Sequence, residues 1–167
     1  MMLLRKEEFY NWAYPDLNNN KTRADVAEFL VAKVLGLDRV QKRDWQSYDM
    51  ITEKGLKIEV KASAYIQSWK QSKPSQIRFD IAPKVFWNEE TGSYSQTKQR
   101  NADVYVFCLL KEMENINPLN TSQWEFYVCK TYLLDQVYGA QKSVGLKSLR
   151  EITTSVEYQD LIGIVSR

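Results

Sequence analysis

The chain of 167 residues contains no histidine. This absence excludes catalytic triads that use an imidazole as the general base, and it excludes zinc sites built on histidine ligands. A metal ion bound by this chain would have to be held by oxygen atoms, which are the ligands that magnesium, manganese and calcium prefer. The absence of histidine therefore limits both the catalytic mechanisms and the metal ions that this chain could use.

Cysteine and long apolar runs are also scarce. Cys108 and Cys129 lie in separate apolar segments, which is more typical of small buried side chains than of a disulfide or a metal pair. No run approaches the roughly 20 apolar residues needed to cross a bilayer. The first residues, MMLLRKEEFYNW, are too polar for a signal peptide. We therefore expect a cytoplasmic protein that has no contact with a membrane.

The hydrophobic patterns predict one α/β domain. Residues 22–35 place small and aliphatic side chains at helical spacing, with Thr22 as the expected N-cap and Gly36 at the end. Residues 56–63 alternate apolar and polar side chains, and 102–110 are almost entirely apolar, as in a central strand. Together these patterns predict a mixed sheet of about five strands. The segments predicted as strands are 37–45, 46–52, 56–63, 76–82, 102–110 and 123–130, and 87–101 is predicted as a loop.

Positive charge is concentrated in the middle of the chain. Residues 54–100 contain nine lysines and arginines against four acidic residues, whereas the rest of the chain carries a net charge of −3. Aromatic residues such as Trp69, Trp87 and Tyr94 are interspersed with these cations, which suits a polyanion such as nucleic acid. The alternative is a solvated, lysine-rich surface.

Residues 48–63, YDMITEKGLKIEVKAS, combine charges with a strand pattern. Glu59 and Lys61 are two residues apart, so both side chains project from one face of the predicted strand. The turn at EKG forms a hairpin that brings Asp49 toward Glu59. Neighbouring carboxylates repel unless a cation lies between them, and a divalent cation is also a reagent for phosphodiester hydrolysis. The alternative is an exposed strand face with an ion pair that contributes little stability.

A further carboxylate, Glu28, lies on the apolar side of the predicted helix 22–35. A carboxylate there is costly unless it is paired or binds a metal ion. The alternative is a glutamate at the edge of the apolar stripe whose carboxylate reaches solvent.

The order of helix, strand, strand, hairpin and strand between residues 22 and 82, with the motifs YDM and IEVKAS, resembles the PD-(D/E)XK phosphodiesterase superfamily. This resemblance implies the restriction-endonuclease-like fold, a three-layer α/β/α arrangement with a mixed central sheet, and magnesium-dependent cleavage of nucleic acid. Asp49 and Glu59 match the two acidic residues of the motif, and Lys61 matches its lysine. Tyr48 replaces the proline of the motif.

The resemblance also implies a set of site residues. Asp49, Glu59 and Lys61 would be catalytic, and the metal ligands would be Glu28, Asp49, Glu59 and the carbonyl of Val60. The ion would be Mg²⁺, with Mn²⁺ as a substitute. We expect one nuclease-like domain over residues 1–167, with a core at about 22–130 and a C-terminal helical extension at about 131–167. The residues expected to contact nucleic acid are Ser63, Gln67, Lys70, Lys73, Arg78, Lys98 and Arg100.

Three functional hypotheses follow from the sequence. The first is a metal-dependent nuclease that cuts DNA, of restriction type or for repair and junction processing, with RNA left open as a substrate. A homodimer would suit this hypothesis, because cutting two strands with one site each requires a two-fold pair. The second is a catalytically inactive nucleic-acid-binding module of the same fold. The third is a structural or regulatory partner protein whose basic segment is only surface.

Overall fold

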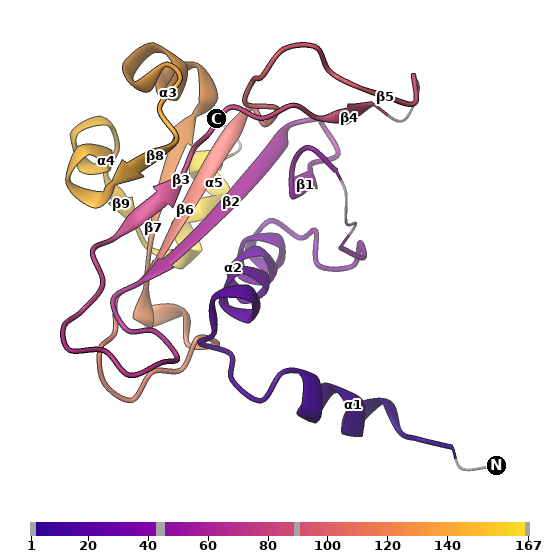
Figure 1. Cartoon of the computed structure of the whole chain (residues 1–167), viewed down its shortest axis with the longest axis vertical. Coiled ribbons are helices and arrows are strands. Elements are labelled where there is room, and N and C mark those ends of the chain that lie inside the picture. Colours follow the sequence, from indigo (N-terminus) through magenta and orange to yellow (C-terminus); the bar gives the residue numbers. More distant parts are fainter. Residues whose placement is uncertain (1–2, 43–45, 89–90, 166–167) are drawn as a thin grey trace.

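A central sheet of five strands runs through the molecule in the order β1-β2-β6-β7-β9 (Figure 1). The computed structural model describes residues 3–42, 46–88 and 91–165. Strands β2 and β6 are parallel, and the other neighbours in the sheet are antiparallel, so the sheet is mixed. The strands are β1 (Met50–Ile51), β2 (Lys57–Ala64), β6 (Val104–Leu110), β7 (Trp124–Lys130) and β9 (Ser155–Val156).

The sequence patterns of β6 and β2 explain their places in the sheet. Every residue of β6 is buried, because this strand is paired on both sides and covered on both faces. In β2, Ile58 and Val60 point into one core. Glu59 and Lys61 alternate with them and lie on the other face. The central strand and the period-two pattern that the sequence predicts are therefore confirmed.

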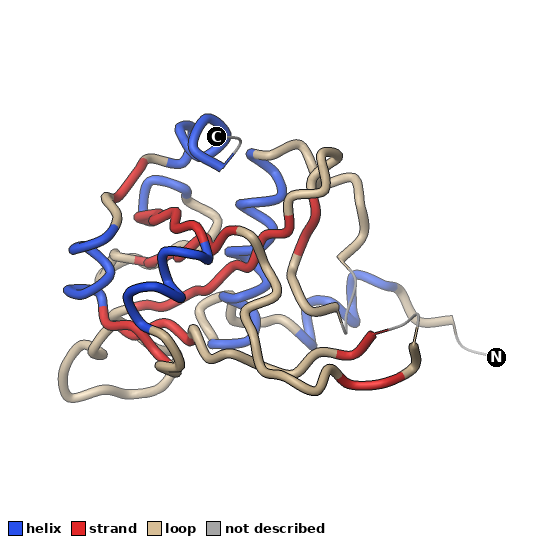
Figure 2. Tube along the Cα trace, turned by 90° about the horizontal axis from the view of Figure 1, so that it is seen from above, coloured by secondary structure: helices blue, strands red, loops and turns tan. Residues whose placement is uncertain are grey.

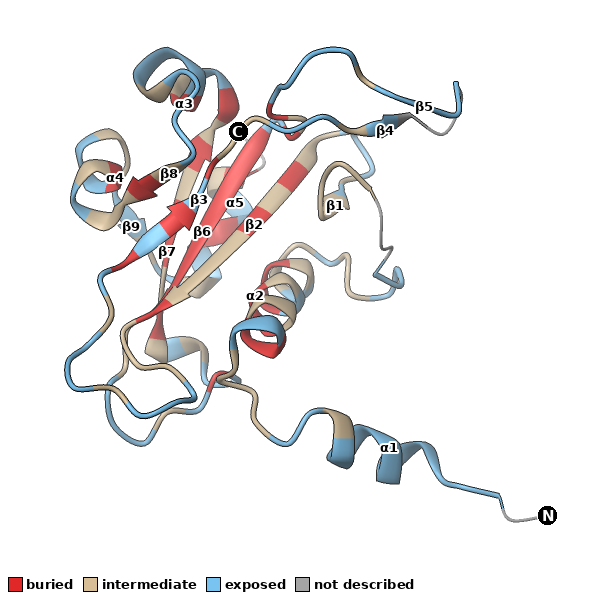
Figure 3. Ribbon diagram, viewed as in Figure 1, coloured by how far each residue is buried: buried red, intermediate tan, exposed pale blue. Residues whose placement is uncertain are grey.

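Helices cover both faces of the sheet. Helices α2 (Asn20–Val34) and α5 (Leu161–Val165) pack on one face and share a core with β2, β6 and β7. The other face is covered by α3 (Thr131–Tyr138), α4 (Leu146–Ile152) and a small sheet of β3 (Arg78–Asp80) and β8 (Ser143–Gly145). Figures 2 and 3 show these layers and the buried residues between them. The predicted three-layer α/β fold with a five-stranded mixed sheet is confirmed.

The helix that carries Glu28 begins earlier than the sequence pattern indicates. Its N-cap is Asn19, whose side chain accepts hydrogen bonds from the backbone N–H groups of Lys21 and Thr22. Thr22 is instead buried within the first turn, so the predicted Thr22 cap is wrong. Gly36 follows the helix with a φ of +72°, a conformation that glycine adopts without a steric penalty, as predicted for the helix end.

Several predicted segments differ from the structure. Residues 37–42 form turns and not a strand, and residues 43–45 of that segment lie outside the described residues. Residues 46–49 are bends, so the strand predicted at 46–52 is reduced to β1. The predicted loop 87–101 contains a hairpin of β4 (Trp87–Asn88) and β5 (Ser93–Tyr94). The predicted C-terminal helical extension also contributes strands, since β8 pairs with β3 and β9 is the fifth strand of the central sheet.

The N-terminal helix α1 (Lys6–Ala13) extends away from the sheet and has no buried residue (Figures 1 and 3). Two short 3₁₀ turns, η1 (Thr121–Gln123) and η2 (Tyr158–Asp160), complete the elements. Cys108 and Cys129 are both buried free thiols. None of the helices within the described residues is long and apolar enough to cross a membrane.

Candidate active site

A tight hairpin places Asp49 next to β2. The turn between β1 and β2 closes through two bonds between Thr52 and Leu56, and Gly55 has a φ of +82° in that turn. As a result, the backbone N–H of Val60 donates to Asp49 Oδ2 at 2.6 Å. The N–H and C=O of one strand residue point toward the same neighbouring strand, so the Val60 carbonyl also faces the Asp49 side of β2. The expected approach of Asp49 to the strand is therefore present.

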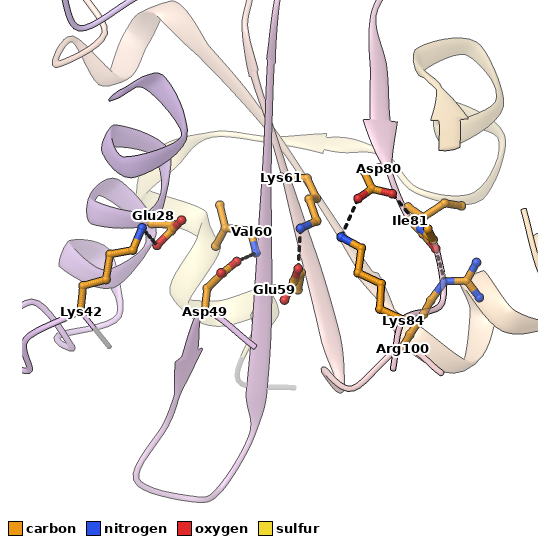
Figure 4. Close-up of polar contacts among 11 residues, drawn as sticks. Glu28, Lys42, Asp49, Glu59, Val60, Lys61, Asp80, Ile81, Lys84 and Arg100 are labelled. Atoms are coloured by element: carbon orange, nitrogen blue, oxygen red, sulfur yellow. Dashed lines mark hydrogen bonds and ion pairs between the residues drawn. The ribbon is translucent and has the colours of Figure 1, made fainter. Parts of the chain in front are cut away.

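Glu59 and Lys61 form an ion pair beside this hairpin (Figure 4). Their side chains are only 16% and 21% exposed, and they line a small pocket together with residues of β3 and of the segment 82–101. Burial, followed by repulsion from Asp49, raises the pKa of Glu59. Burial alone would lower the pKa of Lys61, but attraction to Glu59, Asp49 and Asp80 outweighs it and raises that pKa. The structure therefore excludes the alternative of a strand face that is fully exposed to solvent.

Glu28 approaches the same region from α2. Its side chain is 15% exposed, and its carboxylate accepts from the ammonium of Lys42 at 2.8 Å. Burial and repulsion from Asp49 raise the pKa of Glu28 to about 7, although Lys42 acts in the opposite direction. Glu28 is therefore a paired and largely covered carboxylate, and not an edge residue that reaches solvent.

The three carboxylates lie in a row with Asp49 in the middle (Figure 4). Asp49 raises the pKa of Glu28 on one side and that of Glu59 on the other. Within the parts of the chain that the structure describes, no three acidic or cysteine side chains converge on one point where a metal ion could sit. Lysines hold the two outer carboxylates, so the row is an electrostatically linked set and not a closed coordination shell.

Two pockets are lined by members of the carboxylate row. One, of about 450 Å³, is lined by Glu28, Asp49 and apolar side chains such as Phe29 and Met50. The other, of about 30 Å³, is lined by Glu59, Lys61 and several polar residues, and is close to the volume of a single water molecule. The carboxylate row therefore borders a large pocket on the side of α2 and a small pocket on the side of β3.

The structure adds charged residues that the sequence analysis did not select. Asp80, on β3, pairs with Lys84 at 2.7 Å, and both line the smaller pocket with Glu59 and Lys61. Asp80 acts on the pKa of Lys61, and Lys84 acts on that of Glu59, so the four groups alternate in sign around this pocket. The only sequence signal was a strand-end aspartate followed four residues later by a lysine, which is a common pattern.

The residues expected to contact nucleic acid fall into two groups. Four are exposed: Lys70, Lys73, Arg78 and Lys98. Ser63 is half-buried on β2. Gln67 is also half-buried, and its side chain bonds to Arg23, Ala64 and Ser75, so it connects the loop after β2 to the start of α2.

Arg100 occupies a different environment from the one expected. Its side chain is 1% exposed and donates to the carbonyls of Ile81 and Gln141 at 2.7 and 3.2 Å, and to the carboxylate of Asp135. These bonds fix the base of the segment that carries β4 and β5. The guanidinium does not face solvent, so the expected phosphate contact at Arg100 does not fit this structure.

This role predicts a stability effect for Arg100. Changing Arg100→Met should lower the free energy of unfolding by about 2–3 kcal/mol, because the buried carbonyl of Ile81 loses its donor and Asp135 loses its ion-pair partner. Thermal denaturation should show a decrease in Tm of roughly 5–10 °C for a chain of this size. The matched control is Arg78→Met, since Arg78 is exposed and makes one bond of 3.4 Å to Ser143. Equal Tm values for the two variants would contradict a structural role for Arg100.

Comparison with known proteins defines the class of this fold and site. Residues 7–147, which include all the candidate site residues, match the family profile of bacteriophage T4 endonuclease IV, and this places the chain among the nucleases. The protein belongs to the bacteriophage T4 endonuclease IV family. Among solved structures, that of a bacterial homing endonuclease is similar, with a TM-score of 0.42 and 22% sequence identity over 75% of this chain and 76% of that chain. No curated protein matches the chain.

Proposed function

We propose that this nuclease is a Mg²⁺-dependent endonuclease of the PD-(D/E)XK type that hydrolyses phosphodiester bonds in DNA. The observation that carries the proposal is the hairpin that holds Asp49 against the backbone of Val60, next to the largely covered pair of Glu59 and Lys61. Membership of an endonuclease family supports the hydrolytic class and DNA as the substrate. The biological task is proposed to be restriction, or repair and junction processing.

The donor set fits a hard divalent cation. Glu28, Asp49, Glu59 and the Val60 carbonyl offer only oxygen atoms, which Mg²⁺ and Mn²⁺ prefer. The raised pKa values of Glu28 and Glu59 reflect crowded negative charge that a cation would relieve. Asp49 is central in the row and would be one of the metal ligands. When bound, the ion would lower the pKa of a bound water and polarise a phosphoryl oxygen.

Lys61 would act as a cation in this mechanism. In the metal-free protein its acidic neighbours raise its pKa, so its ammonium carries a positive charge near neutral pH. Its ammonium lies in the same pocket as Glu59 and would orient the attacking water or stabilise the negative charge that develops on the phosphoryl oxygens.

Exposed cations would position the DNA backbone. Lys70 and Lys73 lie on the loop after β2, Arg78 is on β3, and Lys98 follows β5, all on segments that leave the site strands. Contacts of this kind release counterions, so they make affinity depend on salt. Ser63 and Gln67 would act by ordering the loop after β2.

The salt dependence of DNA binding gives one prediction. The double variant Lys70→Ala, Lys73→Ala should bind a DNA duplex more weakly, and the slope of log Kd against log salt should decrease by about two, one for each phosphate that the protein no longer neutralises. Fluorescence anisotropy over a salt series measures this slope. Lys33→Ala is the control, because this exposed lysine lies outside the basic segment and is paired with Asp38. An unchanged slope in the double variant would remove these two lysines from the DNA surface.

The proposed function is tested by incubating the purified protein with supercoiled, linear, branched and single-stranded DNA, and with RNA. Each substrate is tested in Mg²⁺, in Mn²⁺ and in EDTA. A Mg²⁺-dependent endonuclease should nick or linearise supercoiled DNA with either ion and should be inactive in EDTA. Full activity in EDTA would overturn the metal dependence. Salt-sensitive binding with no cleavage in either ion would favour the inactive binding module.

A further inference from the structure

Each outer carboxylate of the row has its own lysine (Figure 4). Glu59 pairs with Lys61, which lies on the same strand. Glu28 pairs with Lys42, which lies in the irregular segment after α2. The ammonium of Lys42 is 2.8 Å from Glu28 and 2.6 Å from Asp25, so one cation bridges two carboxylates of the helix.

The two lysines differ in how firmly they are held. Lys61 is 21% exposed and belongs to β2, which is paired with β1 and β6. Lys42 is 47% exposed and belongs to no helix or strand. If Lys42 leaves Glu28, it keeps Asp25 as a partner, whose side chain is 39% exposed and accessible to water. Moving Lys42 away from Glu28 therefore disrupts little of the fold, whereas moving Lys61 disturbs a covered strand face.

Lys42 also lies in the space that a metal ligated by Glu28 would use. It lines the pocket of about 450 Å³ together with Glu28 and Asp49. A positive charge bound to a carboxylate both occupies its oxygen atoms and repels a second cation nearby. The same pairing explains why Glu28, although covered and close to Asp49, is stable in this arrangement.

We propose that Lys42 is an internal counter-ion of Glu28 that the metal ion must displace, so that this lysine sets the metal affinity of the site. This inference rests on the proposed function, because it takes Glu28 to be a metal ligand. In the absence of metal, Lys42 neutralises the charge of Glu28 and occupies its carboxylate. When Lys42 moves to Asp25 alone, Glu28 becomes free to complete the ligand set with Asp49 and Glu59.

The test is calorimetric titration of the full chain with Ca²⁺, a hard oxygen-preferring cation that replaces Mg²⁺ as a probe of affinity without requiring catalysis. The measurement is made at about pH 8.5 and repeated at about pH 9.5, because Glu28 has a pKa of about 7 beside Lys42 and removing Lys42 raises this pKa further. Lys42→Met, which keeps the aliphatic stem, should bind Ca²⁺ about tenfold more tightly than the unmodified chain, because a charge-assisted competitor is removed. Lys42→Arg keeps the competing charge and should restore the affinity to within about threefold.

The matched control is Arg150→Met. Arg150 lies on α4 and pairs with Glu125 at 2.9 Å, and neither residue lines the pocket of Glu28 and Asp49, so its removal should leave the Ca²⁺ affinity unchanged. Equal or weaker affinity in Lys42→Met, while Asp49→Asn abolishes binding, would overturn the role of Lys42 and leave the proposed function intact. Failure of both the unmodified chain and Lys42→Met to bind Ca²⁺, Mg²⁺ or Mn²⁺ would overturn both proposals.

Discussion

Changing Asp49→Asn is expected to lower the rate of Mg²⁺-dependent plasmid cleavage by about 10³-fold, which corresponds to the several kcal/mol of transition-state stabilisation that a catalytic metal supplies. Asparagine retains an oxygen that can accept the 2.6 Å hydrogen bond from Val60, so the hairpin should keep its shape. What the variant loses is the negative charge at the centre of the row. Initial rates of supercoiled-plasmid nicking at saturating Mg²⁺ measure the effect.

The matched control for this change is Asp103→Asn. The carboxylate of Asp103 accepts a 2.8 Å hydrogen bond from the backbone N–H of Lys57, the first residue of the same strand β2. The two variants therefore remove the same charge from the same kind of bond, but only one lies among the other carboxylates. Loss of cleavage in both would point to a disturbed strand, and full cleavage by Asp49→Asn would remove Asp49 from the ligand set.

Local patterns were sufficient to predict the centre of the fold. The run 102–110 is apolar on both faces, and the strand β6 is buried throughout because it has a neighbour on each side. The alternation in residues 56–63 likewise places Val60 in the core and Glu59 opposite to it. In both strands, the apolar side chains are buried as the pattern predicts, because helices and strands pack on the faces of the sheet.

The ends of helices and the short strands were less predictable. Thr22 and Asn19 are both good N-cap residues, and the choice between them depends on where the preceding chain places the helix. Leu4, Phe9 and Trp12 are spaced to anchor a helix, yet Leu4 precedes α1, and all three side chains are exposed. Hydrophobic spacing shows which side chains share a face, and it contains no information on whether a partner covers that face.

The residues of the candidate site also differ in whether local sequence patterns could predict their positions. Asp49, Glu59 and Lys61 are close in sequence, so a hairpin and strand geometry were sufficient to bring them together. Lys42, Asp80 and Lys84 join them only through tertiary packing of segments that have no motif of their own. Arg100 was selected for its charge, but its burial depends on carbonyls and a carboxylate up to 41 residues away in the chain.

Changing Lys61→Ala is expected to reduce cleavage by about 10²–10³-fold, the cost typical of losing one preorganised group that stabilises transition-state charge. The pKa of Lys61 is raised by its acidic neighbours, so the group lost from the metal-free protein is a positive charge. The control is Lys57→Ala, which removes a lysine four residues earlier on the same face of β2, where its ammonium contacts the ring of Tyr48. Measuring single-turnover nicking of both variants, with DNA affinity determined in parallel, separates chemistry from binding. If Lys61→Ala nicks plasmid at the rate of the unmodified chain, the pairing of Lys61 with Glu59 is structural. The charge that assists hydrolysis must then come from another cation of that pocket, such as Lys84.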